Sequence, residues 1–329
     1  MKNLVITLRN AQIFYSQFGF TETLRKIKTK FAGTKNLVAF SEDTLNIDQI
    51  LHSQEEFAYK RTSFQFIERK NSPKKNFLVF LQSGAGLIDR ERFRELKDHN
   101  FDLIVNNYDY TNTDFFTNLA DQIKYDQTPG ATKFLGYYLI ATKYPDALKT
   151  YDYICFLDDD VEIDLTQIDF LFSKGRELRL DLFQASLSND SHAAWPILKN
   201  SSQKNLNRDF EYFNTVEVMA PFISKRLIDK TLPYFKRSIS TWGIDFVLGH
   251  FCINTFKSFP AVIYSTHMKH GKEINLKEGG FYKMLKKENI DPLDELNMLT
   301  ALVGFEDQKI EMLSNDKIKV DHNLNLKIV

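Results

Sequence analysis

The chain has 329 residues, 43% of them hydrophobic, so it can bury a large core and is too apolar to be a disordered protein. Its 43 Lys and Arg residues balance its 43 Asp and Glu residues, which argues against a general nucleic-acid binder and against bulk electrostatic attraction to a membrane. Two cysteines, Cys155 and Cys252, provide neither a disulfide framework nor a zinc cluster.

The chain starts with a short apolar run, Leu4 to Leu8, that Arg9 and Asn10 interrupt too early for a signal peptide. No later stretch approaches the roughly 20 apolar residues that a membrane-spanning helix needs. We therefore expect a cytoplasmic protein without a transmembrane segment, with peripheral contact to the inner face of the cell membrane as the remaining option.

The composition along the chain predicts three parts. Residues 1–72, with strands expected at 3–8 and 36–40, form an N-terminal accessory region that ends in a polar linker. Residues 73–275 form the main domain, and residues 276–329 form a mostly helical C-terminal extension.

Strands and helices alternate from residue 76 onward, which is typical of βαβ units. The strands expected in the first half lie at 77–82, 101–106 and 153–157, and the helices at 89–97, 114–124 and 132–143. A second set follows, with helices at 166–178 and 243–252 and strands at 181–187, 216–219 and 261–265. The pattern predicts an α/β fold with a mostly parallel, Rossmann-like sheet and helices on both faces.

Three consecutive carboxylates, Asp158, Asp159 and Asp160, directly follow the apolar strand at 153–157. Ligands of open α/β sheets gather at the carboxyl ends of strands. Since alternate residues of an extended chain point the same way, Asp158 and Asp160 could hold one hard divalent cation while Asp159 faces a partner on the nucleotide side. The alternative is a solvated acidic turn in which one aspartate caps the following helix.

Other polar residues follow the neighbouring strands. Ser83 and Gly84 begin a turn whose backbone N–H groups could receive a nucleotide or phosphate, and Asn107 and Asp109 could hydrogen-bond a base or ribose. A plain tight turn explains each segment equally well. Lys133, which begins a helix, could meet a diphosphate, although an exposed lysine in solvent is the competing interpretation.

The segment from Trp242 to Asp245 lies at an expected loop-to-helix junction. Asp245 is placed as a general base and Trp242 could stack on a sugar ring, with the flexible Gly243 between them. The alternatives are an acid that stabilises a helix N-terminus and a tryptophan that packs in the core.

Two histidines, His267 and His270, follow the last expected strand, and a neutral imidazole there could complete the coordination of a divalent metal. Zinc ranks low because no further Cys or His cluster accompanies them.

Four ordered motifs resemble an uncharacterised bacterial and plant family of predicted glycosyltransferases. They are Phe-Leu-Asp-Asp-Asp from Phe156, Val-Glu-Val-Met-Ala-Pro from Val216, Trp-Gly-Ile-Asp-Phe from Trp242, and a final strand followed by a histidine. That family looks like the GT-A nucleotide-sugar glycosyltransferases, whose Asp-x-Asp motif binds Mn²⁺ or Mg²⁺ on the donor diphosphate. The resemblance covers roughly residues 76 to 275.

The resemblance implies a role for each matching residue. It implies Asp158 and Asp160 as ligands of the metal or donor, and Lys133 and Asp109 as residues on the nucleotide side. It implies Asp245 as the catalytic residue, Glu217 near the sugar or acceptor, and His270 rather than His267 as the metal ligand. The chain departs from the family at Tyr264, where the family has an acidic residue.

Together these observations predict a metal-dependent glycosyltransferase that transfers a sugar from a nucleoside-diphosphate donor to a hydroxyl of a glycan or lipid-linked glycan. A bacterial surface polysaccharide is the acceptor suggested by analogy, and Asp245 as base favours inversion. Two alternatives remain: a sugar nucleotidyltransferase, for which the turn from Ser83 to Gly86 lacks Arg and Lys, and a catalytically inactive sugar-binding scaffold.

Overall fold

The computed structural model describes residues 47–68, 74–87, 89–126, 130–200, 209–273, 279–305 and 308–313, and the backbone of 318–320 and 326–328. The strands expected at residues 3–8 and 36–40 lie outside the described residues. No helix in the described part combines the length and apolar character that a membrane crossing needs.

Ten strands of the described chain form one sheet in the order β1-β4-β3-β2-β5-β9-β7-β10-β6, with β8 paired to β10. Strands of one direction are β2 (Phe77–Ser83), β3 (Phe101–Asn107), β4 (Gln122–Asp126), β5 (Tyr153–Leu157), β7 (Leu182–Leu187) and β10 (Ala261–His270). Strands of the opposite direction are β1 (Phe64–Glu68), β6 (Val161–Glu162), β8 (Phe210–Tyr212) and β9 (Phe222–Ser224). The predicted mostly parallel sheet is confirmed.

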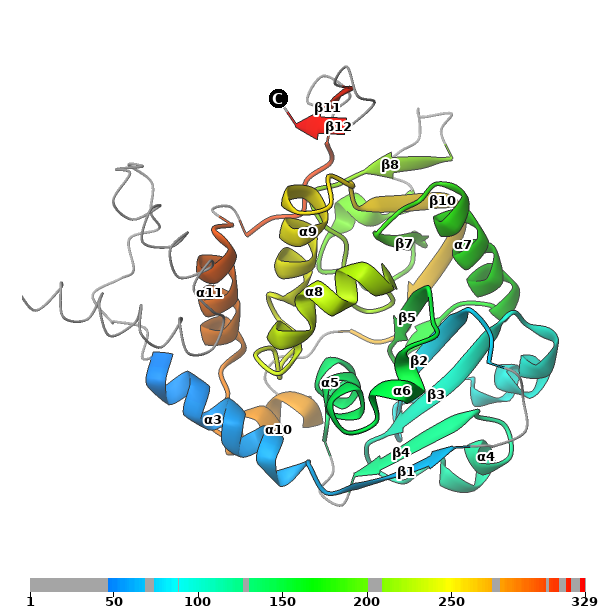
Figure 1. Ribbon diagram of the computed structural model, residues 1–329, viewed down its shortest axis with the longest axis vertical. Coiled ribbons are helices and arrows are strands. Elements are labelled where there is room, and N and C mark those ends of the chain that lie inside the picture. Colours follow the sequence, from blue (N-terminus) through cyan, green and yellow to red (C-terminus); the bar gives the residue numbers. More distant parts are fainter. Residues whose placement is uncertain are drawn as a thin grey trace, which may run out of the picture.

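Helices cover both faces of the sheet, as the sequence predicts (Figure 1). On one face lie α5 (Lys133–Lys143), α8 (Lys225–Phe235) and α9 (Ile244–Asn254), and on the other lies α7 (Leu165–Glu177). Phe156 of β5 packs on Phe134 of α5, with ring centroids 4.9 Å apart, whereas Phe77 of β2 stacks on Phe172 of α7 at 4.7 Å. Aromatic rings therefore join each helical layer to the sheet.

The remaining helices lie around this core. They are α3 (Ile47–Lys60), η1 (Arg90–Asp98), α4 (Thr113–Thr117), α6 (Pro145–Leu148), η2 (Pro196–Leu198), α10 (Gly280–Lys287) and α11 (Pro292–Val303). α11 contacts both α9 and α3, and α10 lies beside α3 in Figure 1. A separate pair of strands, β11 (Ile318–Val320) and β12 (Leu326–Ile328), follows.

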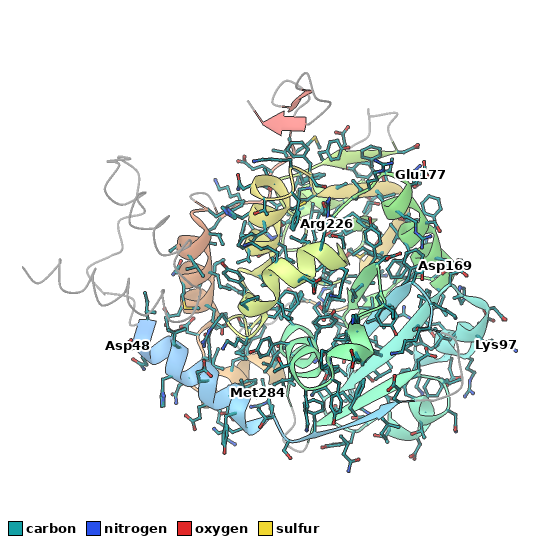
Figure 2. All side chains as sticks on the ribbon, in the orientation of Figure 1. Asp48, Lys97, Asp169, Glu177, Arg226 and Met284 are labelled. Carbon is teal, nitrogen blue, oxygen red and sulfur yellow. The ribbon has the colours of Figure 1, made fainter. Side chains whose placement is uncertain are left out.

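Polar contacts, in addition to the aromatic contacts, attach the helices to the sheet. Asp169 of α7, labelled in Figure 2, accepts a hydrogen bond of 2.9 Å from the backbone N–H of Asn100, and its other oxygen lies 2.7 Å from Nδ1 of His99. Arg226, also labelled, pairs with the buried Asp181 at the start of β7. These pairs tie α7 and α8 to the strand ends.

Three expectations differ from the structure. The helix expected at 114–124 ends at Thr117, and β4 begins at Gln122, because pairing with β3 and β1 outweighs local helix propensity. The strand expected at 216–219 is irregular, and β9 begins only after Pro221, which has no N–H to give to a ladder. The helix expected at 89–97 is the 3₁₀ helix η1 and begins at Arg90, because Asp89 has a left-handed φ of 46° and its side chain makes no capping hydrogen bond.

The described part of the expected N-terminal accessory region contacts the main sheet. β1 pairs with β4 over five residues and forms one edge of the sheet. Lys60 at the end of α3 pairs with Glu288 after α10 at 2.9 Å. Residues 64–68 are thus an edge strand of the main-domain sheet.

Gly175 of α7 provides a test of the packing on this face. A Cβ at this position would lie 2.0 Å from Cζ of the Phe183 ring on β7. Gly175→Ala should therefore lower the free energy of unfolding in urea by about 1–3 kcal/mol, because the buried ring must shift. Gly280→Ala is the matched control: nothing lies within 4 Å of its added Cβ, and its stability should equal or exceed that of the wild type.

Candidate active site

The polar residues predicted from the sequence meet at one edge of the sheet. β2, β3, β5 and β10 all end at this edge, and β9, which runs the opposite way, starts there. Backbone hydrogen bonds of 3.0 Å from Asp158 N to Met219 O and from Phe156 N to Pro221 O hold the residues before β9 alongside β5. We call this group of strand ends the carboxyl edge.

The acidic triplet is largely buried at the carboxyl edge. Asp159 is 9% exposed, and the side chains of Asp158 and Asp160 are 33% and 24% exposed. The N-cap of α7 is Asp164, whose backbone N–H donates a hydrogen bond of 3.4 Å to Oε1 of Gln167, so no member of the triplet caps this helix. The triplet is therefore not a solvated acidic turn.

Lys133 is almost fully buried, at 2% exposure, and its ammonium group contacts three protein oxygens. Its Nζ lies 2.6 Å from Oδ2 of Asp158 and donates to the carbonyls of Val218 and Met219, the latter at 3.2 Å. Burial raises the pKa of Asp158, although the charge of Lys133 acts in the opposite direction. Lys133 thus joins the triplet to the segment before β9, and its expected contact with a diphosphate stays a prediction.

Asp159 and the turn after β2 are packed closely together. The Tyr108 hydroxyl donates a hydrogen bond of 2.8 Å to Oδ2 of Asp159. A Cβ on Gly84 would lie 2.1 Å from the Tyr108 ring, and one on Gly86 would lie 2.8 Å from Asp159, so both positions need glycine for close approach. Burial raises the pKa of Asp159 to about 7 despite this hydrogen bond.

The other residues predicted on the nucleotide side are engaged within the turns. Asp109 accepts hydrogen bonds from the backbone of Ala85 at 2.8 Å and of Thr111 at 3.0 Å, which joins the turns after β2 and β3. Ser83 and Asn107 are fully buried, and Oδ1 of Asn107 has no hydrogen-bond partner among the described residues. A contact of these side chains with a nucleotide stays a prediction.

Asp160 and His270 form the pair best placed to bind a cation. The β10–β6 ladder sets His270 opposite Val161, next in sequence to Asp160, and the two side chains approach to 3.3 Å between Nε2 and Oδ1. Burial alone would lower the pKa of His270, but Asp160 outweighs it and raises this pKa; His270 in turn lowers the pKa of Asp160 against the effect of burial. His267, three residues earlier, is exposed.

The fit of a divalent metal follows from this geometry. Within the described part of the chain, no group of three His, Cys, Asp or Glu side chains is placed to hold a metal ion, and Asp158 is turned to Lys133. Asp160 and His270, once its imidazole has lost the proton, would supply two ligands, which would suit an ion such as Mg²⁺ or Mn²⁺ that takes its other ligands from substrate phosphates and water. A third ligand from Asp158 stays a prediction.

Two further carboxylates, Glu217 and Asp245, are buried and interact with each other. Both are less than 10% exposed, and burial raises the pKa of each to about 7. The charge of Asp245 adds to the shift of Glu217, whose Oε2 has no partner among the described residues. Asp245 lies in the first turn of α9 and accepts a hydrogen bond of 3.0 Å from Phe246 N. Each group therefore changes protonation near neutral pH.

Trp242 and Gly243 belong to the loop before α9. Gly243 has a φ of +83°, and a Cβ on it would lie 3.1 Å from Cα of Leu296, so it packs directly on α11. Ser238 and Ser240 hold the backbone of Trp242 at 3.1 and 3.2 Å. The Trp242 side chain hydrogen-bonds Tyr282 of α10, a residue that the sequence analysis missed because it belongs to no motif.

A surface cavity lies between α3 and α11, where Gln54, Asp294 and Glu295 contribute to its lining. None of the residues of the carboxyl edge lines this cavity. The candidate active site is therefore defined by its converging side chains.

No protein-family model matches the sequence, and no curated protein matches it either. Solved structures with a similar arrangement include a fragment of S. aureus TarS in complex with UDP-GlcNAc, with 9% identity, a TM-score of 0.41, and coverage of 69% of this chain and 71% of that one. GalNAc-T7 with UDP, GalNAc and Mn²⁺ is another, with 8% identity, a TM-score of 0.43, and coverage of 68% and 50%.

Proposed function

We propose that the chain is a glycosyltransferase that moves a sugar from a nucleoside-diphosphate donor to a hydroxyl of a glycan or lipid-linked glycan. The observation that carries this proposal is that the Asp160–His270 pair and the buried Asp245, whose pKa is near 7, both interact with the carboxylate of Glu217, Asp245 directly and the pair through His270. A carboxyl edge with such groups binds phosphates and performs proton transfer in one place. Residues 73–275 carry all of these groups.

The donor side is assigned to Asp160 and His270. These two side chains would hold Mn²⁺ or Mg²⁺, which when bound neutralises the charge of the diphosphate leaving group. Asp159 and Asp109 order the turns around them through Tyr108 and Ala85. The glycines of the turn after β2 keep the backbone close to Tyr108 and Asp159, where the nucleotide would enter.

The acceptor side is assigned to Asp245, Glu217 and Trp242. Above pH 7 the Asp245 carboxylate is ionised and can take the proton from the acceptor hydroxyl as its oxygen attacks the anomeric carbon, which gives inversion. Glu217, with one unpartnered oxygen, would accept a hydrogen bond from a sugar hydroxyl. The ring of Trp242 would stack on a sugar face.

Removal of the cation-binding pair tests this proposal most directly. Asp160→Ala and His270→Ala should each abolish the stimulation by Mn²⁺ of nucleotide-sugar hydrolysis, measured over a panel of UDP-, GDP- and CMP-sugars. Calorimetric titration with UDP should show that binding no longer depends on Mn²⁺. His267→Ala, which changes an exposed histidine on the same strand, should leave both measurements within about twofold of the wild type.

The outcomes separate the candidate functions. Full activity of Asp160→Ala with Mn²⁺ would contradict the assignment of the donor side. Nucleotide binding without any turnover would favour a sugar-binding scaffold, and consumption of a nucleoside triphosphate with a sugar phosphate would favour a nucleotidyltransferase.

A further inference from the structure

A buried carboxylate on α11, Glu295, receives hydrogen bonds from two directions. Its side chain is 0% exposed. Oε1 accepts from Ile239 N at 3.0 Å and from Gln54 Nε2 at 2.7 Å, and Oε2 accepts from Ser240 N at 2.7 Å. The Ser240 side chain also hydrogen-bonds this carboxylate. Every partner is a donor, so the site matches an ionised carboxylate, which only accepts.

The loop that Glu295 holds has an unusual backbone. Thr241 has a φ of 69° and Gly243 a φ of 83°, so two of three successive residues adopt left-handed conformations. Such a conformation is unfavourable for a β-branched residue and persists only where neighbouring groups fix it. The loop carries Trp242 and leads directly into Asp245 at the start of α9.

The other side of the carboxylate is tied to α3. Gln54 Nε2 donates both to Glu295 and to the carbonyl of Arg237, at 2.7 and 2.9 Å. The nearly buried Arg237 pairs in turn with Glu55 at 2.6 Å. Glu295 therefore joins α11 to α3 and to the loop from Arg237 to Gly243. Helices α3 and α11 are in contact and lie near each other in Figure 1.

Burying the charge of Glu295 costs desolvation free energy, which an apolar residue would avoid. No cation pairs with it among the described residues, and burial raises its pKa against the effect of the hydrogen bonds from Ser240, Gln54 and Ile239. Four hydrogen bonds offset part of this cost, and a buried charge of this kind can fix a specific geometry. The geometry fixed here is that of the loop.

We propose that Glu295 is a positioning residue that holds Trp242 and Asp245 in the orientation needed to receive the acceptor. The inference rests on the proposed function for the identity of the acceptor, but not for the geometry of the loop. Glu295→Gln replaces one acceptor oxygen with an NH₂ group that faces backbone donors, so the loop should lose part of its support without a change in side-chain size.

Fluorescence provides a test that does not depend on activity, because Trp195 and Trp242 are the only tryptophans of the chain. In a Trp195→Phe background, Glu295→Gln should shift the emission maximum of Trp242 and increase its quenching by acrylamide. Asp294→Asn, the preceding residue on α11, is the control and should leave the emission unchanged. Ser240→Ala, which removes the hydroxyl that donates to Glu295 and accepts from Trp242 N, should change the emission in the same direction.

Kinetics complete the test. Glu295→Gln should lower kcat for transfer about 10- to 100-fold while the affinity for the donor nucleotide stays within twofold, because only the acceptor side is displaced. Unchanged Trp242 emission in folded Glu295→Gln and Ser240→Ala proteins would overturn the inference even if the wild type transfers sugar. A changed emission in a protein that transfers no sugar would support the loop role and refute the proposed function.

Discussion

Asp245→Asn should lower the rate of sugar transfer about 10²–10⁴-fold, the range expected for loss of a general base. Asparagine keeps the size of the side chain and can still accept from Phe246 N, so donor binding should be retained. Because burial raises the pKa of Asp245 to about 7, the wild-type kcat/KM should rise with pH between 6 and 8, and this rise should be absent from the residual activity of the variant. Initial rates over that pH range check both expectations.

Asp245→Asn should lower activity but raise the free energy of unfolding. The pKa of Asp245 is about 7 in the folded chain and about 4 when unfolded, so the cost of the buried charge is fully present above pH 7 and shrinks as the pH falls toward 4. Asp245→Asn should therefore unfold at a higher urea concentration than the wild type at pH 8, with a smaller difference at pH 5. Asp229→Asn, an exposed acid on α8, is the control; a variant of Asp245 that keeps wild-type turnover would contradict its assignment as base.

Lys133→Met should lower the free energy of unfolding by roughly 2–4 kcal/mol at pH 7. The substitution leaves Asp158 without its cation and the carbonyls of Val218 and Met219 without a donor. This drop in the free energy of unfolding is smaller than the one expected for a fully buried pair. The Asp158 side chain is 33% exposed, so water screens part of its lost interaction with Lys133. Urea unfolding followed by circular dichroism measures the change.

A second variant separates the charge effect from lost packing. Asp158→Asn combined with Lys133→Met removes both charges, so it should be more stable than Lys133→Met alone. Lys143→Met, at an exposed position on the same helix, should change stability by no more than about 0.5 kcal/mol. Equal stability of Lys133→Met and Lys143→Met would show that the Lys133 contacts are not needed to hold the segment before β9.

The sheet could be predicted from the sequence because its central strands are short apolar runs that end in polar turns. β2, β3 and β5 were expected within one or two residues of their observed bounds. β4 was not, since Lys124 is a polar residue that the fold buries completely, and only its neighbours β1 and β3 make that segment extended. β9 is three residues long and gives too little pattern for a prediction.

The sequence indicated which residues belong to the candidate site, but not most of the contacts between them. Local patterns indicated Asp158, Asp160, Asp245 and His270, since each follows or precedes a recognisable element. The pairing of Lys133 with Asp158 and with the carbonyls before β9 depends on segments up to 86 residues apart, which no local pattern records. Tyr282 and Glu295 were missed for the same reason: they act through tertiary contacts made by α10 and α11.

The reversed direction of β9 has a consequence for how such a protein can diversify. A strand that runs against its neighbours brings the residues ahead of it, including Glu217, to the carboxyl edge as an incoming segment. Side chains of the residues ahead of β9 can be substituted without moving any crossover helix that follows β2, β3 or β5. Under the proposed function, the side chain at position 217 can therefore be exchanged for another acceptor contact while the strand ends that carry Asp160 and His270 keep their geometry.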